Sequence, residues 1–255
     1  MPRPTRTVSL GTVIATAAVV PHPPLLVPEL AGAAARETAE LRTACRDVAA
    51  RLAAAGEHWI AVGAAPGAAP ATHHPPGTCG TFAGFGADVR VALAGPATPH
   101  AARRAEPDRE LPLPVLVAGW LRGQAGAAGD AVRIDAHVLP TGTPPAQARR
   151  VGEELAGRGG VLLVLGDGAA THTPRAPGAF DERAAGFDRA VADALAAGDA
   201  AVLAGLDPGL SDALLVGGRV PWQVLAGAVP RPSAARLLHS SAPYGVAYHV
   251  AVWET

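Results

Sequence analysis

The chain has 255 residues, of which 49% are hydrophobic and 17% are charged, so it can bury a core and is not intrinsically disordered. Its formal net charge of −1 at pH 7 provides no basic surface for nucleic acid or for an anionic membrane. Two cysteines are too few for a disulfide framework or a four-cysteine zinc site, which favours a reducing, cytoplasmic environment.

The N-terminal residues allow two interpretations. Arg3 and Arg6 precede an apolar run from 8 to 20, a pattern that a secretory signal peptide also has. We favour a disordered leader over residues 1–11 and a first buried strand from Thr12 to Val20, because the run is apolar without alternation. No apolar run reaches the roughly 18 residues that a membrane span needs.

Helical and strand patterns alternate along the rest of the chain. Apolar residues recur at helical spacing from Glu29 to Ala55 and predict one long helix that Gly56 ends. The further predicted strands are 58–63, 87–94, 132–139, 160–166 and 244–253. The further predicted helices are 113–122, 145–157, 182–197, 207–216 and 221–228. This alternation predicts a single α/β domain over residues 12–255, with a mostly parallel or mixed central sheet flanked by helices on both faces.

Three histidines follow predicted buried strands. His22 lies between prolines at the end of the first strand, His73 comes after the strand that ends at Gly63, and His172 comes after the apolar strand 160–166. Because the loops that follow parallel strands meet at one edge of a sheet, we expect these imidazoles to share a crevice. Imidazole suits metal binding or proton transfer near neutral pH.

Two other patterns are weaker. The turn 166–168 resembles a phosphate-binding loop but lacks the spacing of a third glycine. Asp167 with Ser240 or Ser241 and a histidine would make a hydrolase-like triad, but the chain has no Gly-x-Ser-x-Gly motif. The other histidines, His249 among them, are typical of surface or strand positions.

A set of short motifs is spread along most of the chain. They are Pro21-His22, His73-His74-Pro75, Gly166-Asp167, Thr171-His172, Arg175-Ala176-Pro177-Gly178, Leu206-Asp207-Pro208 and Gly217-Gly218-Arg219-Val220-Pro221. From about Thr12 to Glu254, these motifs resemble the catalytic (B) subunit of the class III extradiol ring-cleavage dioxygenases and the related Memo family.

The resemblance implies a metal site and its ligands. In the dioxygenases two histidines and a glutamate hold a mononuclear Fe(II), and a further histidine acts as acid and base on the catechol and on oxygen. The resemblance implies His22 and His73 as the two histidine ligands, with His74 as the rival for the second. It implies His172 as the acid/base residue, and Asp167 would orient one of these imidazoles. Fe(II) is the implied metal, with zinc or copper as the alternatives.

The chain departs from the family at the third ligand. Gly217 occupies the aligned position, which is glutamate in the dioxygenases and cysteine in the Memo family. Glycine offers no donor atom, so either another carboxylate (Asp167, Asp212 or Glu254) or water completes the site, or the iron site has decayed.

Two functions therefore remain. The first is Fe(II)-dependent ring cleavage of a catechol-type aromatic, in the cytoplasm, with a small aromatic substrate and with neither nucleic acid nor membrane as a partner. The second is a non-catalytic Memo-like protein that binds a metal or a partner. The sequence leans to the dioxygenase-like activity, and the family adds an expectation of self-association or of a second subunit.

Overall fold

The structure is a computed structural model that describes residues 14–66, 70–99 and 106–255, so the predicted leader at 1–11 lies outside the described residues. The main sheet consists of β1 (Ile14–Val20), β2 (His58–Ala65), β3 (Thr72–His74), β6 (Arg133–Pro140), β7 (Gly160–Leu165), β8 (Ala234–Ser241) and β9 (Tyr248–Glu254). Its strand order is β3-β6-β2-β7-β1-β9-β8, while β4 (Cys79–Thr81) and β5 (Arg90–Ala92) pair separately.

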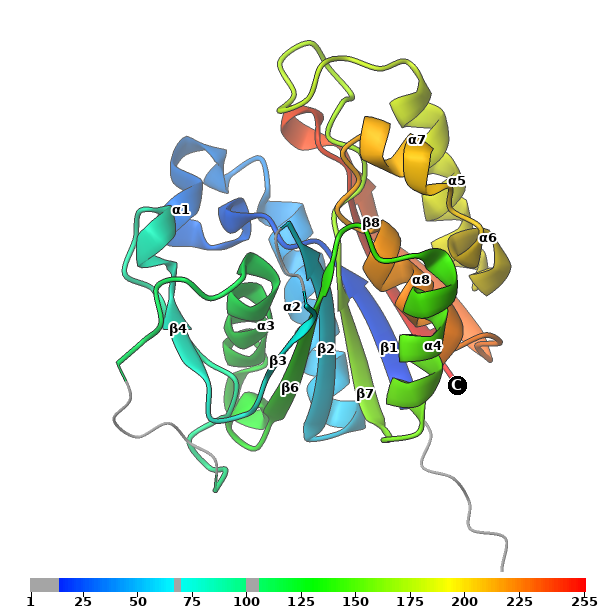
Figure 1. Ribbon diagram of the computed structural model, residues 1–255. Helices are drawn as coiled ribbons and strands as arrows, with labels where there is room; N and C mark the ends of the chain where they lie inside the picture. The colour runs from blue at the N-terminus through cyan, green and yellow to red at the C-terminus, as the bar shows by residue number, and fades with distance from the viewer. Residues whose placement is uncertain (1–13, 67–69, 100–105) are drawn as a thin grey trace, which may run out of the picture.

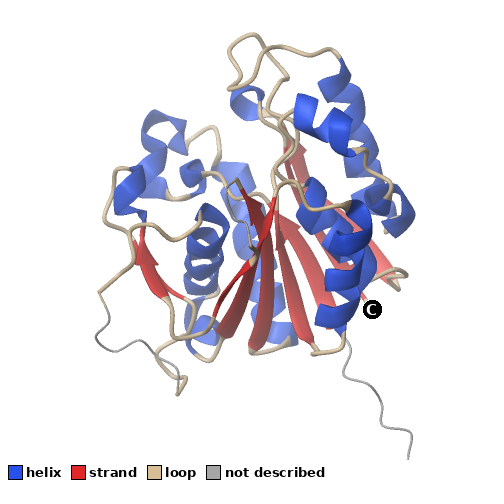
Figure 2. Cartoon of the chain, viewed as in Figure 1, coloured by secondary structure: helices blue, strands red, loops and turns tan. Residues whose placement is uncertain are grey.

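Helices cover both faces of this sheet, as the first two figures show (Figure 1, Figure 2). They are α1 (Pro28–Ala31), α2 (Ala39–Ala55), α3 (Leu113–Gln124), α4 (Pro145–Ala156), α5 (Arg183–Ala197), α6 (Ala200–Ala204), α7 (Pro208–Ala213) and α8 (Arg219–Ala228). One apolar core lies under α2 and α3, and a second lies under α4, α5 and α8. The predicted α/β fold is therefore confirmed. Within the described ranges, no helix combines the length and the apolar character needed to cross a bilayer.

The apolar strand predicted at 160–166 occupies the middle of the sheet. β7 pairs in parallel with β1 on one side and with β2 on the other, and β2 pairs in parallel with β6. β3, β9 and β8 run antiparallel to their neighbours, so the sheet is mixed. Both faces of β7 are covered, which explains why its sequence is apolar without alternation.

The long helix expected from Glu29 to Ala55 is wrong in its first third. Gly32 adopts a φ of 50° and ends α1, and a short 3₁₀ turn leads to α2, which begins at Ala39. A left-handed residue cannot continue an α-helix, and glycine adopts this conformation without a steric penalty.

Several strand assignments also differ from the sequence pattern. The strand expected at 87–94 is shortened to β5 and pairs outside the main sheet with β4, which no pattern predicts. β3 falls in a stretch that the neighbouring prolines indicate is a loop, and β8 has no apolar alternation that would predict it. The last strand begins at Tyr248 rather than at Tyr244, because Tyr244 lies in a 3₁₀ turn with a φ of 56°.

Two glycines allow α4 and α8 to pack in close contact. A Cβ atom at Gly152 in α4 would overlap the carbonyl oxygen of Val224 in α8, and one at Gly227 in α8 would overlap the carbonyl oxygen of Arg149 in α4. This contact holds α8, whose first residue is Arg219, against the sheet. The residues immediately before α8 form part of the candidate site described below.

We predict that Gly152→Ala lowers the free energy of unfolding by about 1–3 kcal/mol, because the added methyl group must push α4 and α8 apart. The matched control is Gly186→Ala in α5, where a Cβ meets nothing within 4 Å. The free energy of unfolding of that variant should rise by about 0.5–1 kcal/mol, because alanine has a higher helix propensity than glycine. Urea denaturation of both variants measures the difference, and equal stabilities would contradict the role of this contact.

Candidate functional site

The candidate site begins at the carboxyl ends of β1 and β7, which stop at the same level because Val20 pairs with Leu165. His22 follows β1 and Asp167 follows β7, so parallel pairing brings the two residues side by side. The backbone N–H of His22 donates a 2.8 Å hydrogen bond to Oδ1 of Asp167. Asp167 therefore holds the main chain of His22, but it makes no hydrogen bond to the His22 imidazole that it was expected to orient.

The imidazole of His22 carries a buried nitrogen that has no hydrogen bond. His22 is only 8% exposed, and its Nδ1 atom lies 3.6 Å from Oδ1 of Asp167, which is too long for a hydrogen bond. Buried polar atoms without partners are uncommon and indicate a place where water, an ion or a ligand completes the contacts. His22 thus presents a polar atom that a small molecule would satisfy.

Gly217 lies next to His22 and leaves open space there. A Cβ atom at position 217 would stand 3.8 Å from Cε1 of His22 and 3.9 Å from Cβ of Asp167, which are ordinary contact distances. The next residue differs, because a Cβ at Gly218 would overlap the indole ring of Trp222. Packing therefore requires glycine at 218 but not at 217, where a side chain would point toward His22 and Asp167.

Tyr248, the first residue of β9, adds a phenol to the same region. Its side chain is 3% exposed. Burial, together with the negative charge of Asp167, raises the pKa of Tyr248 above its ordinary value. The phenol therefore stays protonated at neutral pH and can act as a hydrogen-bond donor.

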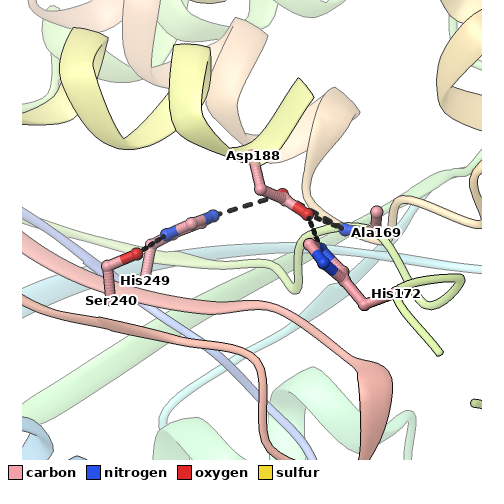
Figure 3. A network of polar contacts seen from close by, with 5 residues as sticks. All are labelled: Ala169, His172, Asp188, Ser240 and His249. Atoms are coloured by element: carbon pink, nitrogen blue, oxygen red, sulfur yellow. Dashed lines mark hydrogen bonds and ion pairs between the residues drawn. The ribbon is translucent and has the colours of Figure 1, made fainter. Parts of the chain in front are cut away.

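A second group of polar residues surrounds Asp188, which lies on the buried face of α5 (Figure 3). Nε2 of His172 is 2.6 Å from Oδ2 of Asp188, and Nε2 of His249 is 3.2 Å from Oδ1. The Ala169 N–H also donates to this carboxylate, at 3.1 Å. Ser240 completes the chain of contacts, with its Oγ 3.0 Å from Nδ1 of His249.

Asp188 determines which nitrogen of each imidazole carries a proton. Carboxylate oxygens accept hydrogen bonds, so we assign the Nε2 atoms of His172 and His249, which face Asp188, as the donors. Nδ1 of a neutral His249 then accepts from the Ser240 hydroxyl. Nδ1 of a neutral His172 is an acceptor, and it makes no hydrogen bond to any residue in the described part of the chain. His172 is therefore equipped to accept a proton from a ligand.

The loop from Gly166 to His172 joins these two groups. Near its start, Asp167 contacts His22, and its carbonyl oxygen accepts a 2.7 Å hydrogen bond from Gly218 N–H. In its middle, Ala169 is bonded to Asp188, and at its end His172 N–H donates to the Gly245 carbonyl oxygen at 3.2 Å. The predicted site residues His22, Asp167 and His172 thus belong to one connected region.

His73 and His74 lie elsewhere, on the edge strand β3. The strand order puts β3 four positions from β1, a separation of about 19 Å at the usual spacing of neighbouring strands. Residues so far apart cannot bind one metal ion. We therefore correct the expectation that His73, or its rival His74, shares a metal and a crevice with His22.

The two β3 histidines have local partners instead. Nε2 of His73 is 2.9 Å from Oδ1 of Asp135, whose Oδ2 is 3.0 Å from Nε2 of His58. The His73 ring also stacks on His137, with the ring centroids 4.8 Å apart. His74 points to the other face of the sheet, where its Nε2 is 3.1 Å from Oγ1 of Thr72.

The carboxylates considered as third ligands are also dispersed. Glu254 lies at the opposite end of the sheet, where it accepts a 3.0 Å hydrogen bond from Thr16, and Asp212 is exposed on α7. Only Asp167 touches His22. Over the described ranges, no cluster of three or more His, Cys, Asp or Glu residues could hold a metal ion. The residues present therefore do not fit a centre of two histidines and one carboxylate.

No sequence pattern assigns a functional role to Asp188 or His249. The usable signal for Asp188 is its place on the apolar face of α5, beside Phe187 and Val191, because a carboxylate is rarely buried without a partner. His249 gave a weaker signal, since it alternates with apolar residues in a strand that is buried on both faces.

Comparison with known proteins adds little to this description. No family model matches the sequence, and no curated protein matches it. Among solved structures, the chain is similar to the uncharacterized protein JW3007 from Escherichia coli K12, at 13% identity and a TM-score of 0.49. The match covers 94% of this chain and 100% of that chain. No conclusion about function is drawn from a likeness of this strength.

We predict that Asp188→Asn lowers the free energy of unfolding by about 1–3 kcal/mol, because an amide cannot accept from both imidazoles and from Ala169 N–H. The control is Asp193→Asn, an exposed residue of the same helix, which should leave stability within about 0.5 kcal/mol of the parent. Histidine ring nitrogen shifts in NMR spectra should report a changed tautomer at His172 or His249. Unaltered tautomers in a folded Asp188→Asn protein would contradict the role given to this carboxylate.

Proposed function

We propose that this chain is an extradiol dioxygenase-like protein that binds a small phenolic molecule but lacks the mononuclear iron centre of that superfamily. The observation that carries the proposal is the open position beside His22, where Gly217 supplies no side chain and Nδ1 of His22 has no partner. The cytoplasm is the proposed compartment, which agrees with the lack of a disulfide bond between Cys45 and Cys79.

The absence of a suitable ligand set argues against ring cleavage with Fe(II). When bound in such enzymes, the metal would supply the coordination sites for catecholate and oxygen. Among the described residues, His22 and Asp167 are the donor residues that lie in contact at these strand ends, and the Asp167 oxygen that faces His22 already accepts the His22 backbone N–H. Ferrous iron ranks low in intrinsic affinity among the divalent metals, so two donors would hold it weakly.

The polar groups of the site suit a phenol. A ring hydroxyl can donate to Nδ1 of His172, whose Nε2 is held by Asp188 at 2.6 Å. The protonated phenol of Tyr248 can in turn donate to a ligand oxygen. Gly217 places no side chain against His22, and the prolines on both sides of His22 restrict its backbone. A second copy or another subunit covering the site remains a prediction.

The decisive experiment compares metal content, oxygen uptake and binding in one preparation. Protein purified without chelators is analysed for metals and then loaded anaerobically with Fe(II). It is next mixed with catechol and 4-methylcatechol in an oxygen electrode. We expect substoichiometric iron, no oxygen uptake and no ring-opened product, while calorimetry detects binding of the same phenols. Stoichiometric iron with oxygen-dependent formation of a coloured product would overturn the proposal, and so would a lack of any phenol binding.

We further predict that Gly217→Glu creates a metal site that the natural chain lacks. The new carboxylate would stand beside His22 and Asp167 in space that admits a side chain. It should raise the affinity for Zn²⁺ by roughly tenfold or more, because a third donor is added. Gly217→Gln is the matched control, with the same shape but no charge, and His22→Ala in the Glu variant should reverse the gain. Calorimetric titration with Zn²⁺ measures all three, and equal affinities of the Glu and Gln variants would contradict the assigned geometry.

A further inference from the structure

A cavity of about 410 Å³ lies at the loop that follows His172 in the chain. Its lining residues come from two loops that are far apart in the sequence: Thr173, Pro174, Arg175, Ala242, Tyr244 and Gly245. The first loop continues the 166–172 segment of the candidate site, and the second precedes β9. The volume falls within the range of natural small-molecule sites.

The Arg175 loop is held in place by the second loop. His172 N–H donates to the Gly245 carbonyl oxygen at 3.2 Å, and Ala176 N–H donates to the Thr173 carbonyl oxygen at 3.0 Å. The two loops also pack directly, because a Cβ at Gly245 would lie 2.6 Å from Oγ1 of Thr173 and 3.0 Å from Cα of Ala176. Arg175 therefore projects from a fixed turn.

Backbone strain is concentrated at the same place. Tyr244 and Leu215, with φ values of 56° and 54°, are the non-glycine residues with positive φ in the described ranges. Both are large apolar side chains that remain exposed, at 46% and 53%. Tyr244 lines the cavity, and a Cβ at Gly178 would lie 2.8 Å from Cδ1 of Leu215, so both residues flank the Arg175 loop. Such conformations cost about 1–3 kcal/mol each and concentrate at ligand sites.

Arg175 supplies a cation that the protein does not neutralise. It is exposed, and within the described residues it makes no hydrogen bond or ion pair. The other arginines near these loops are occupied: Arg183 pairs with Asp181 at 2.6 Å, and the buried Arg219 donates to backbone carbonyl oxygens of Thr141 and Thr143.

The ring of Tyr244 provides an aromatic surface in the same cavity. Its hydroxyl donates a 2.5 Å hydrogen bond to Oε2 of Glu37, which fixes the ring and occupies that carboxylate. A guanidinium fork binds carboxylate or phosphate oxygens in pairs, and an aromatic ring packs against a planar molecule. The cavity therefore combines an oxyanion receptor with a surface for a flat ring.

We propose that this cavity is an anion subsite in which Arg175 binds the oxyanion of a planar phenolic ligand and Tyr244 packs against its ring. The inference rests on the proposed function, because the ligand is the phenol bound beside His172. Two sources of the oxyanion fit the same chemistry, a ring carboxylate and a phosphate monoester.

Calorimetry with matched ligand pairs tests the subsite. One pair is 4-hydroxybenzoate and its methyl ester, and the other is 4-hydroxyphenyl phosphate and 4-methoxyphenol. We expect at least one anion to bind roughly fivefold more tightly than its neutral partner, the magnitude of a partly exposed charge pair. Arg175→Gln should abolish this preference, while Arg183→Gln, which removes the same charge from an exposed neighbour, should keep it.

Tyr244→Asn tests the ring contact separately, since asparagine tolerates a positive φ. The Tyr244→Asn variant should bind the anions and their neutral partners more weakly, and by the same factor. If acid and ester bind equally well to the parent protein, or if Arg175→Gln keeps the preference, the subsite is wrong and the proposed phenol binding stands. If none of the four ligands binds, the proposed function itself fails.

Discussion

The candidate site depends on one buried carboxylate. Asp188 accepts hydrogen bonds from a loop N–H and from two imidazoles that reach it from different parts of the chain. Removing any of these donors would leave a buried charge with unsatisfied lone pairs, which is costly in a low-dielectric interior. Because α5, β9 and the loop after β7 all meet at this residue, their relative positions are fixed together. His172 is rigid for this reason, although it lies in a loop.

The glycines of the site serve different purposes. At Gly168 a Cβ would overlap the Asp188 carboxylate, and at Gly218 it would overlap Trp222, so both are required by packing. Gly217 is under no such requirement. A side chain beside His22 and Asp167 is therefore sterically allowed at 217, whereas packing forbids one at 168 and at 218.

Sequence patterns predicted the parts of the fold that depend on local chemistry. The buried strands β1, β2 and β7 follow from continuous apolar runs, and the helices α4 and α5 follow from apolar residues at helical spacing. The break before α2 depends on the backbone conformation of Gly32, which composition does not reveal. The site was predicted in part: His22, Asp167 and His172 lie in one region because parallel strands end at one edge. His73 was misplaced because strand order is a long-range property, and no pattern within residues 72–74 indicates that β3 pairs with the far edge of β6.

The position of β1 in the sheet has a consequence for how the protein acquires its structure. β1 lies between β7 and β9, so its two edges are completed by residues 160–165 and by residues 248–254. During synthesis, β1 remains without its partner strands until residues 160–165 and then 248–254 have left the ribosome. Such long-range pairing slows folding and leaves an apolar strand without partners in the meantime. Nascent chains of this protein should accordingly depend on chaperones that shield hydrophobic segments until translation reaches β9.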